Sequence, residues 1–248
     1  MPVDDNFNDA AANKPAPGEL SYALRFDSLE TAKALLKRGA DVNDKDYFGN
    51  PVLMTAVFMN QREFFDLLIA GHVDVNATDT DKNTALMLAA QEGSVEFAGL
   101  LIDNGAEVNA KGWYGDTALA IAAYTGHADM IELLVSKGAV VEAKNEDDTT
   151  PLIYAAMHGQ TEAVKMLLKH GASIDEKDKD GKTAMDYAAE KFPETTAVLQ
   201  QVIDDRAAAA AAVLAAEKAR AQAENARQQD LLRGRAPKLA IKPSPRRG

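Results

Sequence analysis

A step of 33 residues repeats through most of this 248-residue chain. The register is read from an apolar residue that recurs without insertion at Leu20, Leu53, Leu86, Leu119, Leu152 and Met185. Neighbouring residues agree, because TALMLAA at 84–90, TALAIAA at 117–123, TPLIYAA at 150–156 and TAMDYAA at 183–189 are variants of one heptapeptide, with PVLMTAV at 51–57 a looser copy. A period of this length predicts stacked units, each contacting its neighbours in the chain.

Each unit contains two apolar segments with helical spacing. Over residues 84–92 the apolar side chains recur at i, i+3 and i+4, and Gly93 can end a helix there. The same spacing returns over residues 97–101, before Gly105. Residues 106–112 are polar and rich in turn formers, which predicts an extended loop to the next unit. Helices this short are unstable alone, so the units must stack.

These units resemble ankyrin repeats, whose pattern is a turn, a T-P-L-H-x-A-A helix, a second helix ending in L-L-x-x-G-A, and a loop with Asn or Asp. The resemblance covers residues 18–205. It implies an all-α ankyrin-repeat solenoid of about six 33-residue helix-turn-helix units with hairpin-like loops, followed by a long C-terminal helix. The motif's histidine is missing, so we expect a less rigid array; its place is taken by Met54, Met87, Ala120, Ile153 and Asp186.

Repeat 2 departs from the pattern at both helix ends. Asn60 stands where the next repeat has Gly93, which is tolerable because Asn also enters the left-handed region. His72 stands where the next repeat has Gly105, and the adjacent Gly71 is a candidate for moving the helix end by one residue.

The regions flanking the repeats differ from them in composition. We expect residues 1–17 to be a mobile leader and residues 18–45 and 179–205 to cap the array. Residues 206–232 are strong helix formers without Gly or Pro and predict an Ala-rich helix. Residues 233–248 are basic and interrupted by proline, which predicts a disordered tail.

Charge and composition limit the classes of partner. Residues 206–248 hold ten Lys/Arg and three Asp/Glu, a net +7, which leaves −18 on residues 1–205. Such an acidic body should repel nucleic acid and anionic membranes, whereas the tail can approach either. No apolar run is long enough for a membrane span, and no signal sequence is visible. We therefore expect a cytoplasmic protein, or a periplasmic one if a signal peptide has been removed.

No pattern of catalytic residues is present in the sequence. It has no cysteine, no glycine-rich phosphate loop, no HExxH and no GxSxG. The four histidines are scattered through the repeats, and the EKDKDGK segment at 176–182 lacks the glutamate of a calcium loop. We expect no enzymatic activity, no cofactor, no metal and no small-molecule substrate.

The variable positions of the repeat hold an excess of aromatic residues. In ankyrin arrays the loop tips and the exposed side of the first helix line one concave surface. Here the corresponding 22 positions hold seven of the chain's 15 aromatic residues. We predict aromatic anchors with an acidic rim, although some aromatic side chains could instead fill gaps between repeats. The predicted partner-binding residues are Tyr47, Phe48, Phe58, Met59, Glu92, Trp113, Tyr114, Tyr124, Glu146, Asp147 and Met157.

Together these features predict a monomeric protein-binding module. Its partner would be a folded protein with a basic, partly apolar patch, docked on the concave face to be inhibited, sequestered or scaffolded. The resemblance to bacterial stand-alone ankyrin-repeat proteins adds one form of this hypothesis, an inhibitor that protects a cell from its own enzyme or toxin. The alternative is a nucleic-acid or membrane-surface tether that acts through the basic tail.

Overall fold

The computed structural model describes residues 14–26 and 28–234 and places six helical repeats in them. The first helices are α1 (Glu19–Phe26), α3 (Val52–Phe58), α5 (Ala85–Glu92), α7 (Ala118–Thr125), α9 (Pro151–Met157) and α11 (Ala184–Lys191). The second helices are α2 (Leu29–Lys37), α4 (Arg62–Ala70), α6 (Val95–Asp103), α8 (Ala128–Ser136) and α10 (Thr161–Lys169), and α12 (Pro193–Gly234) follows α11. Only isolated bridges, and no strands, form within these ranges, so the predicted all-α solenoid is confirmed.

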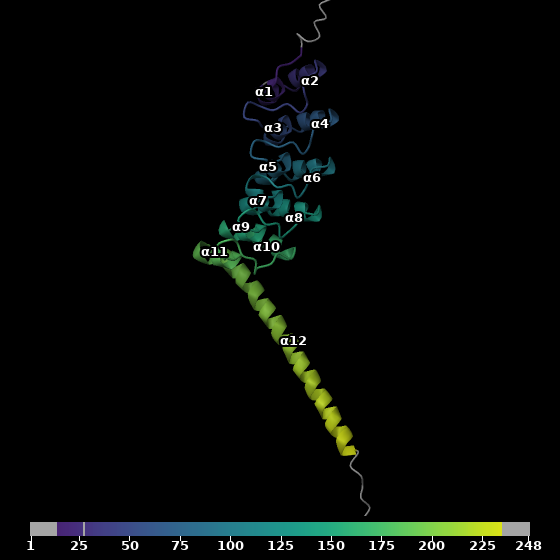
Figure 1. Ribbon diagram of the computed structural model, residues 1–248, viewed down its shortest axis with the longest axis vertical. Helices are drawn as coiled ribbons and strands as arrows, with labels where there is room; N and C mark the ends of the chain where they lie inside the picture. The colour runs from purple at the N-terminus through teal and green to yellow at the C-terminus, as the bar shows by residue number, and fades with distance from the viewer. Residues whose placement is uncertain (1–13, 27, 235–248) are drawn as a thin grey trace, which may run out of the picture. The chain divides into compact units, whose positions relative to one another are not determined.

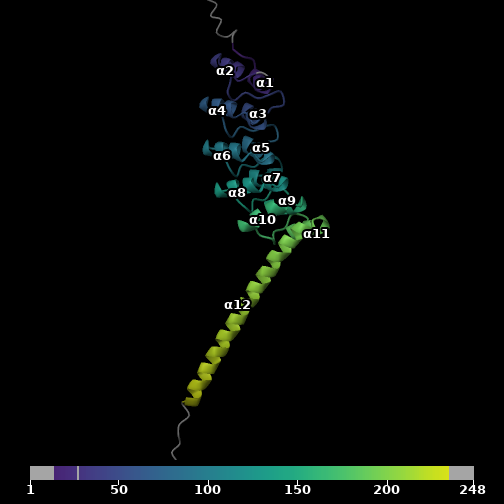
Figure 2. The ribbon, with the colours of Figure 1, turned by 180° about the vertical axis from the view of Figure 1, so that it is seen from behind.

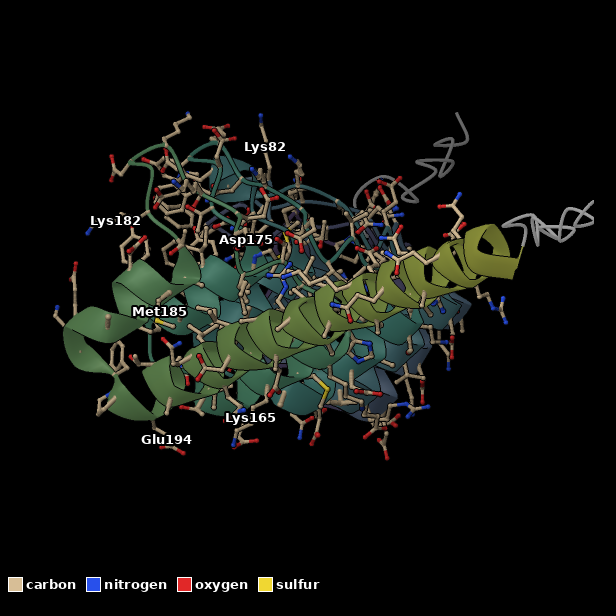
Figure 3. The ribbon with its side chains drawn as sticks, turned by 90° about the horizontal axis from the view of Figure 1, so that it is seen from below. Lys82, Lys165, Asp175, Lys182, Met185 and Glu194 are labelled. Carbon is tan, nitrogen blue, oxygen red and sulfur yellow. The ribbon has the colours of Figure 1, made fainter. Side chains whose placement is uncertain are left out.

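The two helices of each repeat form two parallel columns. The first helices stack on one another, and α1, α3, α5, α7 and α9 also pack on the second helices of their own repeats (Figure 1). The opposite view shows the same two columns (Figure 2). Viewed along the stack, Lys82 and Lys182 lie on the loop side and Lys165 of α10 lies on the other side, with Met185 of α11 between them (Figure 3).

Alanines allow the first helices to approach closely. Ala89, Ala90, Ala122 and Ala123 are fully buried, whereas larger side chains such as Phe97 fill the space beneath the second helices. A threonine hydroxyl at the start of α5, α7, α9 and α11 accepts a hydrogen bond from a backbone N–H in the first turn. The T of the heptapeptide therefore begins the helix, and its alanines face the neighbouring repeat.

An asparagine ladder links successive loops. The side chain of Asn109 accepts a hydrogen bond from Val140 N at 2.9 Å and donates one to the Gly138 carbonyl at 3.0 Å. Asn76 makes the same two bonds to the next loop, to Glu107 N and the Gly105 carbonyl. Each asparagine thus bonds to both a donor and an acceptor of the next repeat, which explains why this residue recurs at the 33-residue step.

The two exceptions in repeat 2 keep the register of the other repeats. Asn60 takes a φ of 53°, as expected for a residue that replaces glycine at a helix end. The expectation for Gly71 was wrong, because its φ is −82° and His72 itself takes the left-handed conformation with a φ of 60°. The helix end does not move, since Val73 N still bonds back to the Leu68 carbonyl.

Replacing His72 with glycine is expected to stabilise the array by about 1 kcal/mol, because the left-handed conformation costs roughly that much for a residue with a Cβ. Urea unfolding followed by circular dichroism measures the change in free energy of unfolding. Asn104 is the matched control, because its φ is −99° and glycine there should lower stability. Equal destabilisation by both changes would contradict the strain at His72.

The last helix is longer than the sequence predicted. The second helix of repeat 6 and the Ala-rich helix form one element, α12, because no glycine or proline lies between Pro193 and Gly234. The described residues from Gln200 onward belong to a second unit of the chain. Within residues 14–26 and 28–234, every helix is too short or too polar to span a bilayer. The expectations for residues 1–13 and 235–248 lie outside the described residues.

Candidate functional site

The loop tips and the first helices together line a groove, called the inner groove below. One of its pockets has a volume of about 590 Å³ and is lined by loop residues such as Trp113 and Asp116 and by helix residues such as Leu88, Ile121 and Tyr124. A second pocket, near α1, lies between Tyr22 and Phe26 of that helix and the tip residue Phe48. The groove is therefore lined by both classes of variable position, the loop tips and the exposed side of the first helices.

An aspartate or asparagine at the base holds four of the five loops in shape. Asp46 Oδ1 accepts hydrogen bonds from the backbone N–H groups of Phe48 and Asn50, both at 2.9 Å. The equivalent residues Asp79, Asn145 and Asp178 accept the same pair of bonds in their own loops. These bonds fix the backbone that carries each tip, so the tip side chains project from a structured turn.

The loop between α6 and α7 is built differently, because Gly112 replaces the residue at its base. A Cβ on Gly112 would lie 2.6 Å from Asn83 Oδ1 and 2.7 Å from Met87 Sδ. The close approach lets Trp113 N donate to Asn83 Oδ1 at 3.3 Å, and Tyr114 takes a φ of 54° in the short turn Trp113–Gly115. The Tyr114 carbonyl accepts from Glu146 N of the next loop at 2.8 Å, so this tip is tied to both neighbours.

The predicted anchor residues are exposed. Tyr47 is 97% exposed, and its ring lies 5.7 Å from that of Phe48, edge to face. Trp113 and Tyr114 are 60% and 52% exposed, with ring centroids 5.2 Å apart. Phe58, Met59 and Tyr124 are also exposed, whereas Met157 is half-buried. Most of this set is therefore open to solvent, although Tyr124 also packs against His158 and Tyr154 of the next repeat.

The predicted acidic residues are exposed as well. Glu92 ends α5, and Glu146 and Asp147 lie at the tip that follows α8. Lys179 Nζ of the next tip lies 3.9 Å from Asp147 Oδ1, a long and exposed ion pair. The structure thus brings Trp113, Tyr114 and Tyr124 together around the 590 Å³ pocket and leaves Tyr47 and Phe48 beside the second one.

The predicted site residues lack a helix position that lies three residues earlier on the same face of the first helix. Tyr154 lies three residues before Met157, on the same face of its helix, and its hydroxyl donates to Asp116 Oδ2 at 3.1 Å while accepting from Asn145 Nδ2 at 2.9 Å. In the next repeat, Tyr187 donates to Asp178 at 2.6 Å, and this bond raises the pKa of Tyr187 to about 12. Each of these residues lies three positions before a variable position on the exposed side of a first helix, and this spacing could have identified them. Tyr22, Leu88 and Ile121 are the equivalent residues of other repeats.

Asp116 is the partly buried carboxylate of the groove. Its burial raises the pKa of the Asp116 carboxyl above the ordinary value. Hydrogen bonds from Asn145 and from the Tyr154 hydroxyl oppose this effect, and the nearby Asp147 charge reinforces it. Burial also raises the pKa of the Tyr154 hydroxyl, and the neighbouring Asp116 charge adds to the effect, so the phenol keeps its proton and donates it. An uncharged Asp116 therefore favours folding, and the ionised form opposes it.

Asp116→Asn is accordingly expected to be more stable than the wild type at neutral pH. A raised pKa in the folded state means that the carboxyl's contribution to stability is present at low pH and is lost as pH rises, so the advantage of the variant should shrink between about pH 7 and pH 4. Urea unfolding across this range measures it. Asp186→Asn should show the opposite sign, because hydrogen bonds from Thr183 lower the pKa of Asp186. The same trend in both variants would contradict the assignment.

The histidines have separate structural surroundings. The His127 ring nitrogen lies 3.0 Å from the Gln91 carbonyl, His158 packs against Tyr124 with ring centroids 4.2 Å apart, and His170 bonds to Glu132 at 2.9 Å. In the part of the chain that the structure describes, no three His, Asp or Glu residues are grouped as metal ligands. Asp178, within the EKDKDGK segment, bonds to its own loop and to Tyr187.

Comparison with known proteins identifies the repeats. The family model for ankyrin repeats in three copies matches residues 53–145 and 140–207, and the model for ankyrin repeats in many copies matches residues 20–69. No curated protein matches the chain. Because these matches span most of the chain and coincide with the helical repeats of the structure, the protein belongs to the ankyrin-repeat family.

Proposed function

We propose that this protein binds a partner protein along its inner groove, without chemistry of its own, to inhibit, sequester or scaffold that partner. Ankyrin repeats generally mediate protein–protein interactions. The observation that carries the proposal is the row of exposed aromatic side chains on the loop tips and first helices, Tyr47, Phe48, Phe58, Trp113, Tyr114 and Tyr124. Exposed aromatic residues gathered on one surface are typical of binding sites.

The construction of the tips supports a preformed site. Hydrogen bonds at the loop bases and between successive loops hold the backbone before any partner arrives. A surface that is already ordered loses little conformational entropy on binding, which favours docking to a folded protein. The exposed acids Glu92, Glu146 and Asp147 favour a partner with a basic, partly apolar patch. We propose a monomeric module, and inhibition of an enzyme or toxin is one form of this function.

Capture from native lysate tests the proposal. The wild type is compared with a Tyr47→Ala, Trp113→Ala, Tyr114→Ala variant whose fold is checked by circular dichroism. A partner that the wild type captures and the variant loses supports docking in the inner groove. Capture of the same partner by both proteins would show that the aromatic surface is not the site.

The basic tail provides a second candidate, because residues 206–248 carry a net +7 charge. A tether to nucleic acid or an anionic membrane would lose its ligand and its salt sensitivity when residues 233–248 are deleted. A protein that binds through the inner groove would keep its partner after the same deletion. The truncated chain therefore separates the two functions in a single capture experiment.

A further inference from the structure

The 590 Å³ pocket of the inner groove has an unusual lining. Four aromatic rings border it, from Trp113, Tyr114, Tyr124 and Tyr154. Tyr124 and Tyr154 lie edge to face with centroids 5.9 Å apart, and Trp113 and Tyr114 form the second pair. Two carboxylates, Asp79 and Asp116, complete the charged part of the wall, and no Lys, Arg or His lines it.

The two carboxylates differ in how far they are already satisfied. Asp79 Oδ1 accepts from the backbone N–H groups of Asp81 and Asn83, and its Oδ2 accepts from the Asn83 amide, so its own loop uses both oxygens. The side chain of Asp116 accepts from the Tyr154 hydroxyl, which lies 3.2 and 3.1 Å from its two oxygens, and the Asn145 amide also stabilises its charged form. Both of these partners are uncharged. Among the described residues no ion pair includes Asp116, so its charge is half-buried without a cation beside it.

An unpaired carboxylate beside aromatic faces suits a particular kind of ligand. A buried or half-buried charge is costly unless an opposite charge and further hydrogen bonds compensate it. Aromatic faces attract cations through the ring quadrupole, and most strongly where water is excluded. The missing component is therefore a cation with an apolar or planar body.

We propose that this pocket receives an arginine side chain of the partner protein, with the guanidinium bonded to Asp116 and stacked on the aromatic wall. This rests on the proposed function and names one side chain that the groove recognises. A guanidinium is planar, donates two parallel hydrogen bonds to a carboxylate and stacks on aromatic rings, whereas a lysine ammonium is a strongly hydrated point charge. The negative lining also fits the basic patch expected of the partner.

The only tryptophan of the chain reports on this pocket directly. Trp113 fluorescence is followed during titration with acetyl-Gly-Arg-Gly-amide at constant ionic strength. Peptides with lysine or with the neutral isostere citrulline in place of arginine are titrated in parallel. For a ligand this small we expect a dissociation constant on the order of 1 mM for the arginine peptide, weaker binding of the lysine peptide and no saturable response to citrulline.

Two variants with the same change in net charge complete the test. Asp116→Asn should weaken binding of the arginine peptide at least about tenfold, because it removes a charge-assisted hydrogen bond. Its fold is checked by circular dichroism, and asparagine occupies the equivalent position at Asn83. Glu107→Gln, an exposed residue outside the pocket lining, should leave binding unchanged.

Three outcomes would overturn the arginine assignment. They are equal binding of the citrulline peptide, equal or tighter binding of the lysine peptide, and an Asp116→Asn variant that binds the arginine peptide like the wild type. If any of these is found while lysate capture still depends on the aromatic tips, the inner groove remains the protein-binding surface and only its arginine specificity fails. Loss of both results would instead remove the proposed function.

Discussion

A Trp113→Ala, Tyr114→Ala variant is expected to bind the captured partner at least about a hundredfold more weakly than the wild type, because two large rings at the centre of an interface commonly act as hot spots. Both rings project from a turn that is hydrogen-bonded to the loops on either side, so the change removes contact area without altering the backbone that presents it. Isothermal titration calorimetry with the purified partner measures the loss.

The matched control for this pair is Val213→Ala, Leu214→Ala on α12. Val213 and Leu214 are 60% and 52% exposed, the same fractions as Trp113 and Tyr114, but they lie in the separate C-terminal unit. Their removal should change the affinity less than about twofold, within the range of a surface substitution. An equal loss of affinity in the two double variants would show that exposed apolar area, and not the inner groove, accounts for binding.

Gly112→Asp should lower the free energy of unfolding by about 1–3 kcal/mol and also weaken partner binding, although it restores the residue type found at the base of the other loops. The added Cβ would lie 2.6 Å from Asn83 Oδ1, so the loop must move away from its neighbour and carry Trp113 with it. Urea unfolding measures the first effect and calorimetry with the partner measures the second.

Gly99→Asp is the control for this substitution. A Cβ at Gly99 meets no atom within 4 Å, so the same carboxylate is added in open space on α6. Its effect on stability should stay within about 0.5 kcal/mol, and its effect on affinity should be negligible. If Gly112→Asp proved as mild as this control, the close contact between neighbouring loops would not be needed to position Trp113.

Periodicity in the sequence predicted the fold because each repeat carries its own helix ends and apolar faces. Gly93 and Gly126 both take positive φ at the ends of first helices, as their recurrence suggested. The end of repeat 2 was less predictable, because the choice between Gly71 and His72 depends on the register in which Val73 bonds to Leu68. Stacking of the repeats kept the helix end in the register of the other repeats, although this forces His72 into a left-handed conformation that glycine adopts more easily.

The candidate site was predicted only in part. Tyr47, Trp113 and Tyr114 were identified because they are aromatic residues at variable loop-tip positions, and the structure places them in the open. Asp116 and Tyr154 were missed because they are 38 residues apart, and only the stacking of two repeats brings hydroxyl and carboxylate together. Contacts of this kind join side chains of different repeats, so the pattern within one repeat does not predict them.

The asparagine ladder does not continue unchanged to the C-terminal end of the array. At the next step along the ladder Glu142 replaces asparagine, and its Oε1 accepts from Ser173 N at 2.7 Å. A glutamate side chain lacks the amide N–H that Asn76 and Asn109 donate to a carbonyl of the following loop. This rung of the ladder is therefore incomplete, and we expect amide hydrogens beyond this junction to exchange with solvent sooner than those of the central repeats.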